Sequence, residues 1–295
     1  MRALLLLLLA GCDLTTFAAN STGSVFARAS PALDEHWDTE LAGDAIPSSL
    51  MQMEGLLRVV PENEEILLNA IRGYVSFGYG WVEDDAERLR AAGESGAADH
   101  QMARAIRIYE RAATLAKYYM ELRHDGFDEA RRGGIEAFRE WLRGVDDAAD
   151  LWWVGYAWGQ HVNAKHPTTA HPDRAFAIAM VRRSVEIDPS VYGSSGSAFL
   201  AFVATRAPGS SLEGAERAWT LALERAGRRN LLMQVVMART YALRARDRDL
   251  YVALLREVLE AGDVEPELRL SNMVAKRRAE RYLREVDRLF SRAAP

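Results

Sequence analysis

Three histidines at five-residue intervals are the residues whose spacing comes closest to metal or acid–base chemistry. They are His161, His166 and His171, with Lys165 between the first two. His166 and His171 each precede a proline, so an irregular loop is expected there. No cysteine or paired carboxylate lies close in sequence to complete a ligand set. We therefore predict no metal site, and we expect the two loop histidines, His166 and His171, to be solvated.

Serine pairs and closely spaced glycines are the other candidates, as catalytic nucleophiles and as a phosphate-binding loop respectively. Ser194–Ser197 and Ser210–Ser211 lack the glycine pattern of a nucleophile elbow, and we predict that they cap helices. Gly78–Gly80 ends a predicted helix instead of opening one, so it presents no row of amide hydrogens to a phosphate. No catalytic residue and no cofactor are predicted, and we expect the protein not to be an enzyme.

The beginning of the chain is typical of an export signal. Arg2 is followed by an unbroken apolar run, Ala3–Ala10, and then by Gly11 and Cys12. Eight apolar residues span about 12 Å as a helix, too short for a bilayer core of about 30 Å. The run Leu9–Cys12 resembles the bacterial lipobox, in which the cysteine is acylated and becomes the new N-terminus. Cys12 is the only cysteine, so no intramolecular disulfide can form. The alternative is a plain signal peptide with an incidental cysteine.

The remaining chain divides into a polar segment and a long helical region. Residues 1–11 are predicted to be the lipoprotein signal peptide and 12–44 a tether that packs in part on the first repeat. The tether contains the polar stretch Asn20–Ser24 and a helix break at Ser30-Pro31. Its polar character is interrupted by three apolar residues, Phe26, Leu33 and Trp37. Residues 45–295 are predicted to form a tetratricopeptide-like helical repeat domain.

Two sets of residues at helical spacing organise that domain. Each set has one bulky residue between two small ones on one helix face, as a helix pressed between two others requires. The sets are Ala177, Val181 and Ser184, and Ala215, Trp219 and Ala222. The apolar segment 194–206 between them is predicted to be the helix that they sandwich. We therefore predict stacked helical hairpins.

No alternating strand pattern occurs in the chain, so the predicted fold class is all-α, with tetratricopeptide-like hairpins stacked into one compact solenoid. The first repeat helix is expected to start at Ile46-Pro47, because proline is favoured at the first helical position. Further helices are predicted over 64–81, 101–122, 135–142, 147–163, 250–259 and 266–289.

The segment 147–163 is the most apolar of the predicted helices. Its apolar residues cover nearly the whole circumference, so it is buried on every side or it lines an apolar cavity. One interpretation is that its aromatic side chains are core. The other is that they form the wall of a hydrophobic passage, together with Trp81 from the preceding region. The candidates for this wall are Trp81, Trp152, Trp153, Tyr156 and Trp158.

Composition excludes two classes of protein. Hydrophobic residues make up 49% of the chain and charged residues 27%, which is typical of a globular protein and not of a disordered one. The formal net charge is −5. Phosphate binding requires positive charge clustered on one face, so we expect no nucleic-acid partner.

Several short motifs, taken together, resemble the TRAP-transporter-associated T-component (TatT) family. They are Gly80–Glu83, Trp153–Gly159, Ile187–Pro189, Pro266–Asn272 and Arg277–Glu280. The resemblance covers about Ala18 to Phe290 and has the lipobox in front of it. It implies a periplasmic protein held at a bacterial membrane by an N-terminal lipid. It further implies a homotrimer that docks the periplasmic substrate-binding protein of a TRAP transporter and carries a passage for hydrophobic, lipid-like molecules.

A second hypothesis belongs to a different class. The helical array could be a scaffold lipoprotein of the cell envelope that binds no small molecule. The apolar helix 147–163 is compatible with both hypotheses.

Overall fold

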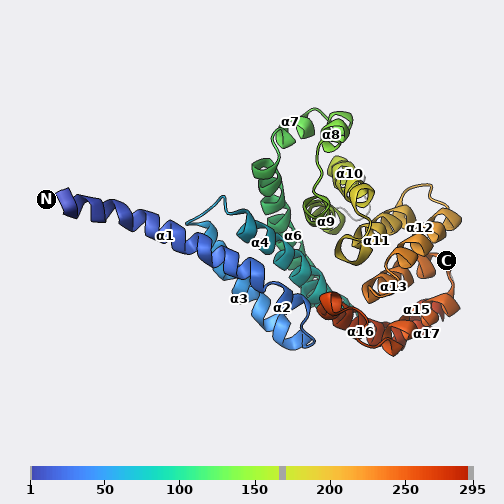
Figure 1. Cartoon of the computed structure of the whole chain (residues 1–295). Helices are drawn as coiled ribbons and strands as arrows, with labels where there is room; N and C mark the ends of the chain where they lie inside the picture. Colours follow the sequence, from blue (N-terminus) through green and yellow to red (C-terminus); the bar gives the residue numbers. More distant parts are fainter. Residues whose placement is uncertain (1, 166–170, 292–295) are drawn as a thin grey trace. The chain divides into compact units, whose positions relative to one another are not determined.

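The computed structural model describes residues 2–165 and 171–291, with side chains from residue 14 onward within those ranges (Figure 1). Within this described part of the chain, all regular secondary structure is helical and none is strand. The predicted all-α fold class is confirmed. Contacts divide the chain into two compact units. Unit 1 comprises Met1–Leu33, Glu40–Trp141 and Ala157–Arg174, and unit 2 comprises Asp34–Thr39, Leu142–Tyr156 and Ala175–Pro295.

Unit 1 is organised around the long helix α6. Its elements are α1 (Arg2–Ala29), α2 (Pro31–Asp34), α3 (Thr39–Leu57), α4 (Glu64–Phe77), the π-helix η1 (Gly78–Glu83), α5 (Asp84–Ala91), α6 (Ser95–Arg123), α7 (Phe127–Arg132), α8 (Ile135–Leu142) and the second half of α9 (Ala148–Lys165). Helices α4, η1 and α5 all pack against α6. Tyr109, Ala112 and Ala116 of α6 are fully buried there.

Helix α4 shows how the sequence sets these contacts. Its N-terminus is capped by Asn63, whose side-chain oxygen accepts a hydrogen bond from the amide of Ile66 at 2.9 Å. The helix changes to π geometry at Gly78, inside the segment predicted as one helix over 64–81. A Cβ atom at Gly78 would lie 2.6 Å from the ring of Tyr109. The glycine is therefore required by the close approach of α6.

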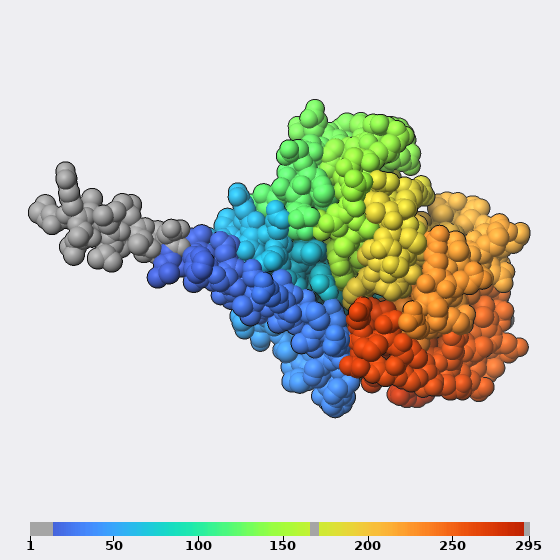
Figure 2. Space-filling view, viewed as in Figure 1, coloured from blue at the N-terminus to red at the C-terminus, as the bar shows by residue number. Residues whose placement is uncertain are grey.

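The predicted tether is helical over most of its length. Helix α1 ends at Ala29, just before the predicted break at Ser30-Pro31, and packs along α4 (Figures 1 and 2). The side chain of Asn63 donates a hydrogen bond to that of Asn20 at 2.8 Å, and Ser24 donates one to Glu65 at 2.6 Å. The polar stretch is thus ordered by partners at the start of α4.

The predicted start of the next helix was wrong by several residues. Helix α3 begins at Thr39, and Pro47 lies inside it. Ala42 and Ile46 are buried on the same helix face as Leu50. Burial of this continuous face extends the helix backwards through the proline, although Pro47 lacks the amide hydrogen that an interior position normally donates.

Unit 2 continues the helical series to the end of the described chain. Its elements are the first half of α9, α10 (Pro172–Ile187, in this unit from Ala175), α11 (Val191–Arg206), α12 (Leu212–Arg225), α13 (Leu231–Met237), the π-helix η2 (Ala238–Ala242), α14 (Leu243–Ala245), α15 (Arg248–Glu260), the 3₁₀ helix η3 (Pro266–Leu268), α16 (Arg269–Arg284) and α17 (Val286–Ser291). The region predicted as one helix over 266–289 is divided at Glu285.

Helix α11 lies between α10 and α12, as predicted from the two sets of small residues. The first set, on α10, and the second set, on α12, are buried throughout. A Cβ atom at Gly196 of α11 would lie 2.6 Å from Val185 of α10, and α11 also packs closely on α12. Ser211 caps α12 by accepting a hydrogen bond from the amide of Gly214 at 3.0 Å, which confirms the predicted cap.

Candidate functional site

The first half of α9 carries three of the predicted passage residues in unit 2. Asp147 precedes the helix and accepts a hydrogen bond from the amide of Asp150 at 3.0 Å. Trp152 and Trp153 are buried, whereas Tyr156 is half-buried. Since successive α-helical residues point in different directions, burial of adjacent tryptophans shows that this half-helix is enclosed on more than one side.

The aromatic rings form a continuous cluster, which we call the α9 aromatic cluster: Trp152, Trp153, Tyr156, Tyr192 and Phe199. Trp152 and Tyr156 are stacked, with ring centroids 4.7 Å apart and planes inclined by 13°. Trp153 meets Tyr192 edge to face at 4.7 Å, and Tyr156 meets Phe199 edge to face at 6.4 Å. Such geometries add about 0.5–1.5 kcal/mol per pair beyond burial.

Close packing of α9 on α10 fixes the backbone behind this cluster. A Cβ atom at Gly155 would lie 2.9 Å from Val181 and 3.2 Å from the carbonyl oxygen of Ala177. The hydroxyl of Ser184 on α10 donates a buried hydrogen bond of 2.6 Å to the carbonyl oxygen of Ala148. The small residues of α10 therefore position the aromatic half of α9.

A left-handed turn borders the cluster at the start of α11. Tyr192, Gly193 and Ser194 have φ values of 47°, 58° and 63°. The two non-glycine residues are strained in this region of backbone space. Asn230 holds the turn by donating hydrogen bonds to the carbonyl oxygen of Gly193 at 3.1 Å and to the hydroxyl of Ser195 at 3.0 Å.

The turn corrects the prediction that Ser194–Ser197 cap a helix. The hydroxyl of Ser195 donates to the carbonyl oxygen of Tyr192 at 2.7 Å, and Ser190, which precedes α11, makes no side-chain cap. Ser195 therefore stabilises the left-handed turn at the start of α11. The local sequence does not predict this turn, because Asn230, which holds it, is distant in the chain.

The indole N–H of Trp152 is buried and has no hydrogen-bond partner. Trp152 is only 2% exposed. An unsatisfied buried donor costs about 1–3 kcal/mol, so it requires an explanation.

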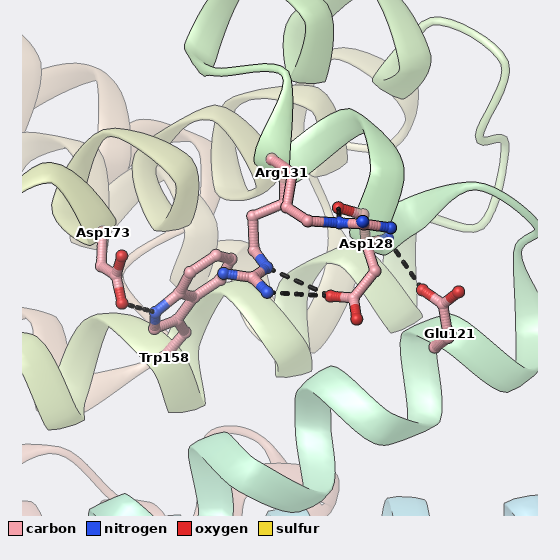
Figure 3. Close-up of polar contacts among 6 residues, drawn as sticks. Glu121, Asp128, Arg131, Trp158 and Asp173 are labelled. Atoms are coloured by element: carbon pink, nitrogen blue, oxygen red, sulfur yellow. Dashed lines mark hydrogen bonds and ion pairs between the residues drawn. The ribbon is translucent and has the colours of Figure 1, made fainter.

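Trp158 lies in unit 1 and has a different environment. Its indole N–H donates a hydrogen bond to Asp173 at 3.1 Å (Figure 3). Close by in Figure 3, Arg131 pairs with Asp128 at 3.1 Å, and the amide of Asp128 donates to Glu121 at 2.8 Å. The polar atom of Trp158 is therefore satisfied within the protein.

The rings around Trp158 form a second aromatic group, in unit 1. Phe127 and Phe138 contact Trp158 edge to face at 6.4 and 6.5 Å, and Trp141 stacks on Phe138 at 5.5 Å. The ammonium group of Lys117 lies 5.5 Å from the Trp158 ring centroid. Phe127, Phe138 and Trp158 are fully buried, and together they form a core that joins α6, α7, α8 and α9.

Trp81 also belongs to unit 1, where η1 carries it. It is half-buried, and its ring stacks on that of Phe77 at 6.1 Å. A Cβ atom at Gly43 of α3 would lie 2.3 Å from the Trp81 indole nitrogen. The indole therefore packs on the glycine of α3. Trp152, Trp153 and Tyr156 thus lie together, whereas Trp81 and Trp158 take separate places in unit 1.

The histidines do not form a cluster in the described residues. His161 is half-buried on α9, and burial, followed by the positive charge of Lys165, lowers its pKa. His171 Nδ1 accepts a hydrogen bond from the amide of Asp173 at 3.2 Å. His166 lies outside the described residues. Across residues 14–165 and 171–291, no group of three or more His, Cys, Asp or Glu side chains is placed to hold a metal ion.

The predicted lipidation site, Cys12, falls on α1, but its side chain lies outside the described side chains. Among the described residues, no helix combines the length and the apolar character that crossing a membrane requires.

The fold and site define a class of protein: an all-helical repeat protein with an aromatic internal helix. The model of the TRAP transporter T-component family matches residues 35–290. The chain therefore belongs to the TRAP transporter T-component family, and the family resemblance predicted from the sequence is confirmed. No match was found among curated proteins. Membership indicates an accessory component that associates with a TRAP transporter in the cell envelope.

Proposed function

We propose that this protein is a lipid-anchored periplasmic component that docks the substrate-binding protein of a TRAP transporter and passes hydrophobic ligands to it. The observation that carries this proposal is the family match, which extends over residues 35–290 and so includes nearly the whole described helical chain. The platform is a homotrimer, as the family resemblance implies.

The α9 aromatic cluster supports the hydrophobic passage. Trp152, Trp153 and Tyr156 bring a large apolar area to one half-helix, and Tyr156, which stacks on Trp152, is the half-buried member that an apolar chain can reach first. Trp81 and Trp158 remain candidates for the passage wall. Trp158 has less to offer a ligand, because its indole N–H is already bonded to Asp173.

Exposed apolar side chains on α3 support association with other protein chains. Leu41 is 56% exposed and Met51 is 64% exposed, and Val59, just after the helix, is also exposed. Leu41 and Met51 share the exposed side of the helix with Gly55. Exposed apolar surface of this kind is typical of interaction sites.

Acylation of Cys12 supplies the membrane anchor in this proposal. The first apolar side chains after it, Leu14 and Phe17, are 68% and 67% exposed. This end of α1 therefore remains uncovered by the described protein, as a segment beside a lipid anchor would be.

Native mass spectrometry tests the docking platform. The mature chain from residue 12, carrying Cys12→Ser to avoid detergent, is mixed with the substrate-binding protein of the cognate TRAP transporter. We expect a homotrimer that carries bound substrate-binding protein. A monomer that captures none of it would favour the scaffold alternative.

A fluorescent fatty-acid probe tests the passage. Saturable binding that weakens in Trp153→Ala is expected, because that substitution removes a ring contacting both Trp152 and Tyr192. If the folded protein does not bind the fatty-acid probe, the passage is contradicted. The docking role is tested separately, by native mass spectrometry.

A further inference from the structure

The buried tryptophans differ in one respect, which is whether the indole N–H has an acceptor. Trp219 donates to the hydroxyl of Thr205 at 2.9 Å, Trp158 donates to Asp173 at 3.1 Å, and the less buried Trp141 donates to the carbonyl oxygen of Asp125 at 2.9 Å. Trp152 donates to nothing, although it is 2% exposed. The unsatisfied donor therefore belongs to Trp152 and is not a general property of indoles in this fold.

An indole can only donate, so the missing partner must be an acceptor. A phenylalanine would supply an aromatic ring without the cost of a buried, unsatisfied N–H, so the N–H group itself needs an explanation. Buried donors of this kind are explained by function or by a group bound at the site.

The surroundings of Trp152 are suited to an apolar ligand. One ring face is stacked on Tyr156 at 4.7 Å, and Trp153 lies at 6.1 Å. Gly196 of α11 lies close to the same ring: a Cβ atom added there would be in van der Waals contact with Trp152 at 3.8 Å and would meet Val185 at 2.6 Å, so the ring is enclosed by apolar groups on this side. A hydrogen bond formed in such a low-dielectric site is stronger than one formed in water.

Strained backbone adjoins the same site. The left-handed turn at Tyr192–Ser194 ends two residues before Gly196, and Tyr192 packs on Trp153. Strain of this kind persists where the surrounding contacts impose it, and it is concentrated at ligand sites. This observation is independent of the unsatisfied N–H and points to the same half-helix.

We propose that the Trp152 indole N–H recognises an acceptor oxygen, of a carboxylate or a carbonyl, on an otherwise apolar ligand held against Trp152 and Tyr156. The inference rests on the proposed hydrophobic passage and adds a determinant of specificity to it. The donor is neutral, so an ester is accepted as well as an acid. An ammonium head group offers no acceptor and leaves the indole unsatisfied.

Three probes of equal chain length test the recognition on the mature protein with no substitution in the α9 aromatic cluster. Dodecanoate and dodecylamine are titrated below their critical micelle concentrations and methyl dodecanoate below its solubility limit, with Cys12→Ser in place of the acylated residue. We expect the acid and the ester to bind with dissociation constants within about threefold of each other, and the amine to bind about tenfold more weakly, equivalent to about 1.4 kcal/mol. Equal binding of the amine would overturn the proposal.

Trp152→Phe and Trp219→Phe form a matched pair of variants in unit 2. Trp152→Phe should weaken dodecanoate binding about tenfold and leave the unliganded protein as stable as before or more stable, because it removes an unsatisfied donor. Trp219→Phe should lower the midpoint of thermal unfolding, since it breaks the bond to Thr205, and leave dodecanoate binding unchanged. If Trp152 served packing alone, Trp152→Phe would instead lower the midpoint of thermal unfolding, because the smaller ring leaves a cavity.

Indole N–H signals from ¹⁵N-labelled tryptophan provide a direct reading, with Trp152 assigned by its loss in Trp152→Phe. Addition of dodecanoate should move this proton signal downfield and leave that of Trp219 in place. If acid and ester bind the unaltered protein but the Trp152 signal and the variant affinity do not change, the inference fails and the passage stands. If neither probe binds, the passage fails and the inference fails with it.

Discussion

The guanidinium of Arg111 on α6 makes two parallel hydrogen bonds to the carboxylate of Glu54 on α3. Its Nε donates to Oε1 at 2.7 Å and its NH2 nitrogen donates to Oε2 at 2.6 Å. The hydroxyl of Tyr74 on α4 donates to the same Oε1 at 2.8 Å. One carboxylate therefore ties three helices of unit 1 together.

Glu54→Gln should lower the free energy of unfolding by about 1–2 kcal/mol, because the paired, charge-assisted bonds to Arg111 are lost. Urea denaturation measures the change. Glu136→Gln is the matched control: Glu136 also pairs with an arginine, Arg139, but its side chain is 80% exposed against 20% for Glu54. The control should change stability by less than about 0.5 kcal/mol. Equal effects of the two substitutions would show that the enclosed geometry contributes nothing.

The same pair predicts a dependence of stability on pH. The hydrogen bonds from Arg111 lower the pKa of Glu54 below its ordinary value of 4.5, against the opposing effect of burial. Because the folded pKa is the lower one, the stabilisation is complete above the unfolded pKa and is lost as the pH falls through the folded pKa. Burial, followed by the Glu54 hydrogen bond, raises the pKa of Tyr74 to about 12, so its hydroxyl remains a donor throughout.

The difference in unfolding free energy between the unaltered protein and Glu54→Gln should therefore be constant near neutral pH and should shrink below pH 4.5. Denaturation at a series of pH values measures it. A difference that grew as the pH fell would contradict the sign of the pKa shift.

The parts of the fold that sequence predicts well are those set by residues near in the chain. The spacing of apolar residues over 135–142 predicted α8 with the bounds that the structure gives. Serine at position 211 predicted the cap of α12. In each case the deciding contacts lie within a few residues, so the periodic pattern and the cap chemistry were sufficient.

The parts that sequence missed are set by contacts distant in the chain. The π-helix at Gly78 accommodates Tyr109 of α6. The left-handed turn at Gly193 is held by Asn230, 37 positions further on. No local propensity of glycine or tyrosine specifies either partner.

The candidate site was predicted in part for the same reason. The composition of 147–163 indicated an aromatic helix, but Tyr192 and Phe199 join its cluster only through the packing of α11. Sequence also could not separate Trp152 from Trp158, because the acceptor that distinguishes them, Asp173, is brought to Trp158 by the fold.

Cys12→Ala should release the protein from membranes, because acylation of this cysteine is the proposed anchor. Fractionation followed by mass spectrometry of the mature N-terminus measures both location and acyl mass. Ser21→Ala, a change at an exposed position of α1, is the control and should leave the protein in the membrane fraction. Retention of the Cys12→Ala protein in membranes would mean that something other than acylation holds it there.

Two glycines in helices should respond oppositely to the same substitution. In Gly155→Ala, the new Cβ would meet Val181 at 2.9 Å, the Cβ atom of Met180 at 3.1 Å and the carbonyl oxygen of Ala177 at 3.2 Å. Two of these atoms belong to or adjoin the α10 backbone and cannot move alone, so α9 and α10 must separate. In Gly55→Ala on α3, the new Cβ would meet nothing within 4 Å.

Gly55→Ala should therefore raise the free energy of unfolding by about 0.5–1 kcal/mol, the ordinary gain from replacing a helical glycine. Gly155→Ala should lower it by about 1–2 kcal/mol, because overpacking outweighs that gain. Denaturant midpoints with unchanged slopes measure both changes. Stabilisation by Gly155→Ala, as by Gly55→Ala, would mean that α10 can move away from α9 with no loss of stability. The close approach of the two helices would then not be needed to position the α9 aromatic cluster.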